Sequence, residues 1–463
     1  MLNDITVILV TICIVSLSIY LFSFSINSFK LTKLNLISYL FYKDILVFSL
    51  VGVLLVVLSI DEKFDLYFWA ISNQVSDLTR YIGWIAVLYF MLAFPIGLIL
   101  GNFFVCKSMK PSLLNKYIIK NNENSLIYFD DSLFISVFIF SIISLLSILY
   151  VYASLHTIPL MALLKGADSS TLAVLRGDAK IEFSGSTIVR DIVALKLAPL
   201  LSYIAYAQSK LTGRRKWKYA FYCLFILTLP ALTYNLQKAP FLFYLIGFIL
   251  IKVLLGDKVG KKTILYSGIV LIVGLTISFV AIMGVGNIGH LIDDLSQRIL
   301  IAQTSAIFLS FEYFPKFHDF LGVSSVSGVI SNLMSEDKVY YGRALFELYN
   351  PDAVESGKAG YIVGNLIAES WALFGLWGAL LLPIWSGFFV SSISNILLRL
   401  PKHGAFIGLY AYIALNLSLT GGVAQFLNSI VLLSPVFYVT CLLSCSYIIK
   451  KAVLRYRKET EIC

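Results

Sequence analysis

The sequence is poor in charged residues. They make up 13% of its 463 positions, whereas a typical soluble domain carries about 25%. Hydrophobic residues make up 59%, and the mean hydropathy is +0.86. So little charge cannot cover a surface in water, which excludes a soluble domain, a disordered chain and a nucleic-acid binder despite the net charge of +10. We therefore expect an all-α, polytopic membrane protein.

Several chemical motifs are also missing. The six cysteines form no C-x-x-C pair and no cluster with histidine, so neither a disulfide framework nor a metal site is expected. No P-loop, HExxH or GxSxG is present. Gly284, Gly286 and Gly289 match a dinucleotide fingerprint, but they follow an apolar run instead of a strand. We expect no cofactor and no nucleic-acid partner. The first apolar run lacks a preceding basic segment, so we expect it to be retained as a span.

Apolar runs of about 18 or more residues predict transmembrane helices. The sequence has about 11 of them, in what we expect to be a single integral membrane domain, 1–463. Their ranges are 5–29, 35–60, 81–105, 131–155, 191–209, 219–236, 240–256, 263–284, 361–392, 404–420 and 426–449. The second run carries two charges and the ninth is overlong, so either could divide into an interfacial piece and a span.

The distribution of charge predicts the orientation. If the basic C-terminal tail is cytoplasmic, alternation of the runs places 23 of the 36 Lys and Arg residues in cytoplasmic connections. It places 19 of the 26 acidic residues on the outer side. Because cytoplasmic loops collect Lys and Arg, this asymmetry predicts an N-terminus on the outer side of the membrane and a C-terminus in the cytoplasm. The two long connections, 156–190 and 285–360, then lie outside, and we expect both to be partly helical.

The first long outer loop and the start of the next run concentrate cations against this trend. They are Lys165, Arg176, Lys180, Arg190 and Lys196. One interpretation is a site for a phosphorylated lipid, because Arg binds phosphate oxygens bidentately and Lys supplies a point charge. The alternative is a solvated loop whose acidic residues, including Asp178, neutralise these cations. Lys196, inside a run, is expected to snorkel or to line a wet cavity.

The second long outer loop carries a polar stripe and an aromatic segment. Arg298, Ser305 and Glu312 are seven residues apart, so they share one face of a helix expected before Pro315. This stripe is either the water side of that helix or the lining of a cavity. In the second case it would share the cavity with a later segment, whose tyrosines and charged residues suit a sugar: Tyr340, Tyr341, Arg343 and Glu347.

These features together resemble the Wzy-type O-antigen polymerases of bacterial inner membranes. The resemblance rests on the polytopic architecture, the basic first outer loop and the segment that begins at Gln297. It also rests on an E-x-x-x-x-F-G-x-x-G element read as Glu369, Phe374, Gly375 and Gly378. The chain departs from an Arg-x10-Gly pattern of such enzymes, because Thr187 and Val354 stand at the glycine positions after Arg176 and Arg343.

The resemblance implies a glycosyltransferase that needs neither metal nor nucleotide. It would polymerise undecaprenyl-diphosphate-linked repeat units at the periplasmic face, with a chain-length regulator and a flippase as partners. Arginines and lysines would neutralise the departing diphosphate, since positive groups stabilise charge that develops in the transition state. A carboxylate would act as base, and Glu369, Asp178 and Glu347 are the candidates. For Glu369 the alternative is a structural ion pair with Lys196 or an outer-loop arginine.

Two rival functions use the same features. An O-antigen ligase would share the architecture and the lipid-linked donor but transfer the glycan to lipid A core. A lipid-linked oligosaccharide flippase would move the donor without chemistry. Internal symmetry and charges at mid-span would favour the flippase.

Overall fold

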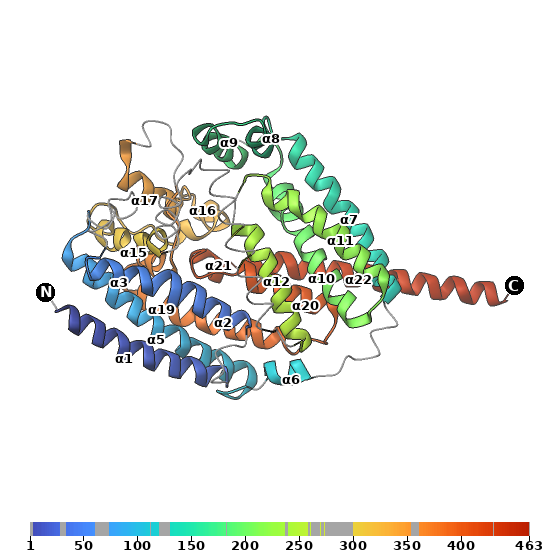
Figure 1. The fold of residues 1–463 in the computed structure, drawn as a ribbon, viewed down its shortest axis with the longest axis horizontal. Coiled ribbons are helices and arrows are strands. Elements are labelled where there is room, and N and C mark those ends of the chain that lie inside the picture. Colours follow the sequence, from blue (N-terminus) through green and yellow to red (C-terminus); the bar gives the residue numbers. More distant parts are fainter. Residues whose placement is uncertain are drawn as a thin grey trace. The chain divides into compact units, whose positions relative to one another are not determined.

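The fold is described by a computed structural model, and all regular secondary structure among the described residues is helical. That part comprises residues 3–27, 34–60, 74–111, 113–119, 130–181, 183–236, 239–257, 260, 269, 273, 300–352, 361–428 and 430–462. Seven helices in it are long and apolar enough to cross a membrane. The chain is therefore an all-α membrane protein (Figure 1).

The chain divides into two compact units. The first contains Met1–Leu113, Asn287–Ile396 and Leu417–Ser429, and the second contains Leu114–Gly286, Leu397–Asn416 and Ile430–Cys463. Each unit is therefore assembled from segments that are distant in the sequence.

The first unit is built around the long helices α5 (Asp77–Cys106) and α19 (Leu366–Leu397). Its other elements are α1 (Asp4–Ser25), α2 (Leu36–Leu40), π-helical η1 (Phe41–Val51), α3 (Gly52–Val57), α15 (Ala302–Tyr313), η6 (Val323–Val326), α16 (Gly328–Met334), α17 (Tyr341–Tyr349) and α21 (Ala424–Leu427). Polar groups join α1 to α5, since Trp84 Nε1 donates to Thr11 Oγ1 at 3.0 Å. The carbonyl of Ile384 on α19 lies directly over Gly97 of α5, because glycine lets two helix backbones approach closely.

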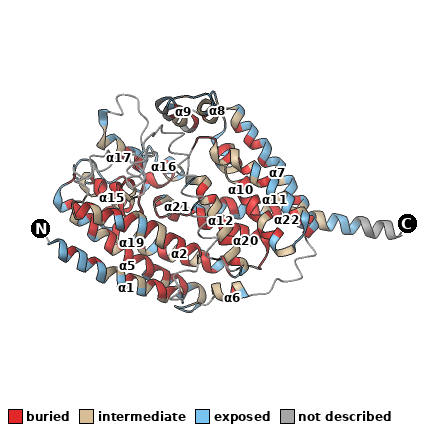
Figure 2. Ribbon diagram, viewed as in Figure 1, coloured by how far each residue is buried: buried red, intermediate tan, exposed pale blue. Residues whose placement is uncertain are grey.

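The second unit is built around α10 (Leu197–Thr212), which packs on α11 (Arg215–Thr233) and α20 (Gly404–Asn416). Its other elements are α6 (Leu113–Ile119), α7 (Asp130–Ala153), α8 (Pro159–Leu164), α9 (Ser169–Ile181), η4 (Val189–Ala194), α12 (Ala239–Leu255) and α22 (Ile430–Ile462). Aromatic rings in edge-to-face contact fill part of the core, where the centroids of Tyr203 and Phe248 lie 5.2 Å apart. In the most apolar part of the helical segment Val189–Thr212, 72% of the residues are buried, compared with 22% in the corresponding part of α1 (Figure 2).

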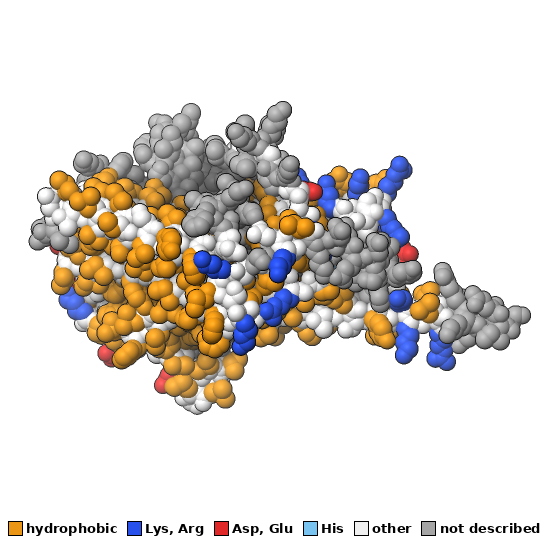
Figure 3. Space-filling view, turned by 90° about the horizontal axis from the view of Figure 1, so that it is seen from below, with side chains coloured by type: hydrophobic (Ala, Val, Ile, Leu, Met, Phe, Trp, Pro, Cys, Tyr) orange, Lys and Arg blue, Asp and Glu red, His pale blue; other side chains and the backbone are white. Residues whose placement is uncertain are grey.

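Exposed apolar side chains on several helices agree with contact to lipid. Figure 3 shows one face on which hydrophobic side chains cover much of the surface and Lys and Arg form small groups. On α7, Phe138 is 60% exposed and Leu146 is 60% exposed. Such side chains would be costly in water and are ordinary in a bilayer.

The long apolar helices coincide with seven of the predicted spans, and two shorter apolar helices, Pro240–Leu255 and Gly404–Asn416, coincide with two more. The tenth run, predicted as 404–420, is helical only to Asn416. The ninth, predicted as 361–392, begins at Leu366 and continues to Leu397. The predicted span 263–284 lies outside the described residues, apart from two isolated positions. The number of 11 spans therefore stays a prediction.

Candidate functional site

The candidate site surrounds a polar loop of the first unit, residues 418–423, which precedes α21. Two neighbouring segments hold the backbone of this loop. The N–H of Leu366, at the start of α19, donates to the carbonyl of Leu419 at 2.8 Å. The N–H of Leu419 donates to Asp44 Oδ2 at 2.8 Å. The loop therefore has fixed backbone partners although it is not helical, as a polar segment within an apolar fold requires.

Asp44 is fully buried, and every contact that it makes serves the 418–423 loop or its own helix. Besides the Leu419 N–H, it accepts a hydrogen bond from Ser418 Oγ at 3.1 Å. Its other oxygen lies 3.1 Å from Lys43 Nζ. Asp44 sits on η1, where the helix is wider than an α-helix; such π-helical turns are frequent at functional sites. Sequence reasoning missed this pair as part of a site, although two charges inside an apolar run are a signal of one.

Glu369 holds the other end of the 418–423 loop. Its Oε2 accepts a hydrogen bond from the N–H of Val423 at 2.9 Å. Gly422 has φ +88°, and a Cβ at this position would overlap Oε2. Only glycine therefore lets the carboxylate approach the backbone so closely. Glu369 lies in the first turn of α19, where a negative charge is stabilised by the helix dipole.

Glu369 therefore has a hydrogen-bonded partner, but not the one expected of a structural ion pair. Within the described residues no ion pair joins Glu369 to Lys196 or to an arginine. The ammonium group of Lys338 is the cation that acts on it electrostatically. Its second oxygen has no protein hydrogen-bond partner in the part of the chain that the structure describes.

Two tyrosines stand close to Glu369 in the first unit. Tyr341 is buried, and its hydroxyl lies 2.7 Å from Ser310 Oγ. Burial raises the pKa of Tyr341 well above its usual range, and the charge on Glu369 adds to this shift. Partial desolvation also raises the pKa of Tyr361, again with a contribution from Glu369, although this residue is 58% exposed. Both phenols therefore stay neutral at physiological pH and can serve as hydrogen-bonding groups instead of bases.

The other residues of the segment 340–347 that were predicted to bind a sugar are more exposed than Tyr341. Tyr340 is 57% exposed, and Lys338 Nζ lies 4.7 Å from the centre of its ring. Arg343 and Glu347 pair with each other one helical turn apart on α17, with Nε and Oε1 2.6 Å apart. Both of their side chains are about half exposed, so this pair contributes little to stability. Its groups remain accessible to a solute.

The E-x-x-x-x-F-G-x-x-G element has a structural counterpart in α19. Gly375 has φ 59° and ψ −142°, so the helix is kinked there. The kink frees two carbonyls, and the segment before η6 binds both. Leu321 N–H donates to Ala372 O at 2.9 Å and Gly322 N–H to Leu373 O at 3.1 Å. A glycine at position 375 thus anchors a part of the second long loop on the helix that carries Glu369.

The remaining predicted site residues lie in the second unit. Arg190 is buried and makes two hydrogen bonds to the carboxylate of Asp191, at 2.8 and 3.0 Å. It also donates to the carbonyl of Ala179, at 3.3 Å, on the helix α9. Arg176 and Asp178 are half-buried on α9. Lys196 Nζ donates to Ser434 Oγ of α22 at 3.2 Å.

The structure thus gathers Glu369, Tyr340, Tyr341, Arg343 and Glu347 within the first unit, and Arg176, Asp178, Arg190 and Lys196 within the second.

The polar stripe of the second long loop is only partly described, and one expectation for it is wrong. Arg298 lies outside the described residues. Ser305 is buried and donates to Ala302 O, so it is not on the water side of α15. Glu312 accepts hydrogen bonds from Ser76 Oγ and Thr79 Oγ1, which caps the start of α5. Helical periodicity could not reveal these packed partners.

Comparison of the chain with protein-family models, with curated proteins and with solved structures finds no match.

The arrangement in the first unit suits proton transfer beside a bound polar solute. Glu369 is held in one orientation by Val423, while its other oxygen can accept a hydrogen bond from a hydroxyl group. The neutral phenol of Tyr361 and the aromatic ring of Tyr340 are sugar-compatible surfaces nearby in the same unit. Within the described residues, no group of three or more His, Cys, Asp or Glu could hold a metal ion.

Proposed function

We propose that the protein is an inner-membrane glycosyltransferase that polymerises undecaprenyl-diphosphate-linked repeat units into O-antigen or a related surface polysaccharide. The observation that carries the proposal is the structural role of the E-x-x-x-x-F-G-x-x-G element. Glu369 supports the polar 418–423 loop, and Gly375 forms the kink that binds residues 321 and 322. The element that resembles the polymerases thus carries the carboxylate that holds the polar 418–423 loop.

The reaction requires a base and positive charge, but no energy carrier. A hydroxyl group of the incoming repeat unit attacks the anomeric carbon of the growing glycan. The new glycosidic bond forms while the bond to the lipid diphosphate breaks, and the diphosphate leaves with both electrons. In our proposal Glu369 accepts the hydroxyl proton, with Glu347 and Asp178 as the alternative carboxylates.

The charge on the departing diphosphate would be neutralised by cations of the two long loops. The candidates are Arg176, Arg190, Lys196, Arg298 and Arg343. Arg190 is already held by Asp191, so binding of a diphosphate there would have to displace or share that carboxylate. Arg343 has the more exposed side chain, at 58%. Among the arginines of this set that the structure describes, it is the one that a solute reaches with the least rearrangement.

The proposed orientation has the N-terminus in the periplasm and the C-terminus in the cytoplasm. Reporter fusions after residues 120, 215 and 258 should then report cytoplasm, and fusions after residues 175 and 335 the periplasm. A periplasmic signal at residue 215 would contradict the orientation, and with it a periplasmic site.

The function is tested by deleting the gene and separating the extracted lipopolysaccharide on a gel. A polymerase mutant should keep a single repeat unit on the core, because ligation still works. Loss of that single repeat as well would indicate the ligase instead. Complementation with Glu369→Gln should fail to restore long glycans at normal protein levels. Glutamine can still accept the Val423 N–H, so this variant removes the base while it keeps the loop contact.

A further inference from the structure

An apolar groove runs between α7 and α11 of the second unit. Its volume is about 670 Å³, which lies within the usual range of roughly 300 to 1,000 Å³ for ligand sites. Val137 and Leu224 form its floor and are buried, at 2% and 3% exposure. Phe138 and Ile226 form its rims and are 60% and 66% exposed. The groove therefore has a buried apolar floor and exposed apolar rims, on a surface that can contact lipid.

The two helices run in the same direction, so the groove has a defined start and end. At one end Lys216 of α11 pairs with Asp130 of α7 at 2.9 Å. Toward the other end Tyr152 Oη donates to the carbonyl of Pro230 at 3.0 Å. The α7 side of the groove extends from Phe134 to Leu145. At about 1.5 Å per residue this is about 16 Å, close to the half-thickness of about 15 Å of a hydrocarbon core.

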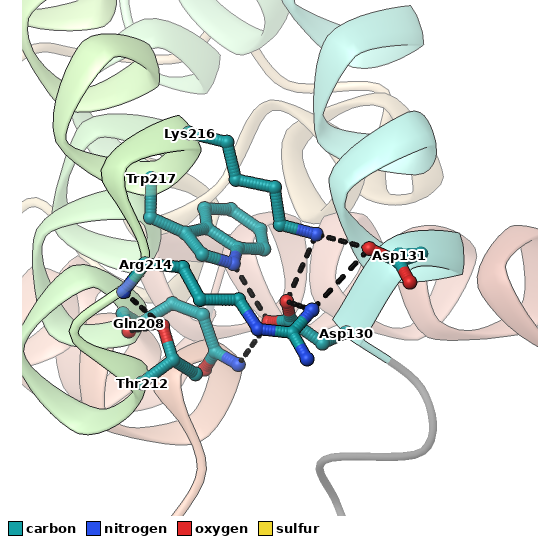
Figure 4. Close-up of polar contacts among 7 residues, drawn as sticks. All are labelled: Asp130, Asp131, Gln208, Thr212, Arg214, Lys216 and Trp217. Carbon is teal, nitrogen blue, oxygen red and sulfur yellow. Dashed lines mark hydrogen bonds and ion pairs between the residues drawn. The ribbon is translucent and has the colours of Figure 1, made fainter.

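The end at Lys216 is charged and rigid. Asp130 is buried and accepts hydrogen bonds from Gln208 Nε2 at 3.0 Å and Trp217 Nε1 at 2.7 Å (Figure 4). It also pairs with Arg214 Nη1 at 2.7 Å, and Asp131 contacts both Lys216 and Arg214 (Figure 4). This network fixes the cations at the mouth of the groove, so a ligand there meets an already ordered site.

The charge at this mouth is positive in sum. Residues 214–218 carry four cations, and Asp130 and Asp131 supply two negative charges. Arg215 and Lys218 are exposed, and no ion pair to either is found in the described part of the chain. Arg215 lies one helical turn before Tyr219, which lines the groove, whereas Lys218 lies one turn before Tyr222, which does not.

We propose that this groove binds one acyl chain of an anionic diacyl phospholipid, with the headgroup phosphate at Arg215 and Lys216. The groove has the length of an acyl chain in one leaflet and a mouth with a positive charge at the depth of the headgroups. A zwitterionic lipid would fill the same groove but would gain less from the cations. The groove shares no residue with the proposed polymerisation site, and the proposal requires only that α7 and α11 lie in a bilayer.

The test measures lipid that stays bound to the purified full-length protein. The protein is exchanged into detergent with equal amounts of phosphatidylglycerol and phosphatidylethanolamine of matched chains, and bound lipid is counted by native mass spectrometry. Wild type should retain phosphatidylglycerol about fivefold over phosphatidylethanolamine, the preference expected from about one favourable cation contact. Arg215→Gln should bring the two lipids close to parity, and the matched control Lys218→Gln should not.

A second pair of variants tests the groove itself. Ala220→Trp fills the groove and should release both lipids, whereas Tyr222→Trp adds the same ring on the exposed side of α11 and should release neither. Equal retention of the two lipids by wild type would overturn the proposal, as would equal effects of Arg215→Gln and Lys218→Gln. Displacement of phosphatidylglycerol by an equal amount of undecaprenyl phosphate would assign the groove to the isoprenoid carrier instead. If Ala220→Trp does not fold, the comparison of the surface variants Arg215→Gln and Lys218→Gln still tests the proposal.

Discussion

Replacing Gly422 by alanine should lower the stability of the first unit, through backbone strain and through an overlap between the new Cβ and Glu369 Oε2. The φ of +88° alone costs about 1 to 2 kcal/mol for an L-residue. The overlap adds about 1 to 3 kcal/mol, the usual cost of overpacking. If the carboxylate moves away instead, its charged hydrogen bond to Val423 is lost at a similar cost of about 1.5 to 3 kcal/mol. We therefore expect a total loss of about 2 to 5 kcal/mol.

The matched control separates strain from overlap. Gly166 has φ +82°, and a Cβ there would meet nothing within 4 Å. Gly166→Ala should therefore cost only the strain, about 1 to 2 kcal/mol. The assay is the midpoint of thermal unfolding of purified full-length variants in one detergent. In a Glu369→Ala background the overlap is absent, so the added effect of Gly422→Ala should fall to that of Gly166→Ala. Equal midpoints for Gly422→Ala and Gly166→Ala in the wild-type background would refute the reasoning.

Three further outcomes are expected. Asp130→Ala should destabilise the protein by about 3 kcal/mol, because it leaves buried donors and cations unpaired. The side chain of Asp131 is 83% exposed, so Asp131→Ala should cost less than about 1 kcal/mol. Equal unfolding midpoints for the two variants would contradict this prediction. Arg343→Ala should shorten glycan ladders while its effect on the unfolding midpoint stays small, and full-length ladders would exclude it from the site. Hydrogen bonds from Thr79 and its neighbours outweigh desolvation and lower the pKa of Glu312 to about 2. The contribution of Glu312 to the free energy of unfolding, at most about 3 kcal/mol, should therefore be complete above pH ~4.5 and lost between pH ~4.5 and ~2. A stability difference between wild type and Glu312→Gln that does not shrink on acidification would be inconsistent with this prediction.

Hydropathy was sufficient to predict most of the membrane helices, because burial in lipid depends on composition over about 20 residues. The run predicted as 131–155 is the helix α7, Asp130–Ala153, and the run predicted as 240–256 is α12, Ala239–Leu255. The end of α20 at Asn416 was not predictable in this way. Leu417 and Leu419 keep the hydropathy high beyond Asn416, but in the structure this segment is not helical, and Asp44 and Glu369 bind the backbone of the 418–423 loop.

The candidate site was predictable only where one residue carried its own signal. Glu369 was a candidate because it belongs to the E-x-x-x-x-F-G-x-x-G element and because a carboxylate inside a predicted span is costly and usually has a partner. The identity of that partner, a backbone N–H 54 residues further on, depends on tertiary packing. Lys43 and Asp44 gave the same signal, but their span lies more than 300 residues before the loop that they bind, with no local pattern to connect them.

The most direct test of the proposed function is reconstitution of the purified full-length protein in liposomes with one undecaprenyl-diphosphate-linked repeat unit. Wild type should produce a ladder of longer glycans on the lipid diphosphate and release undecaprenyl diphosphate without added metal or nucleotide. Glu369→Gln should bind the substrate and produce no ladder. Absence of a ladder with folded wild-type protein would contradict the proposal that the protein is a polymerase. A full ladder with Glu369→Gln would contradict the role of Glu369 as its base.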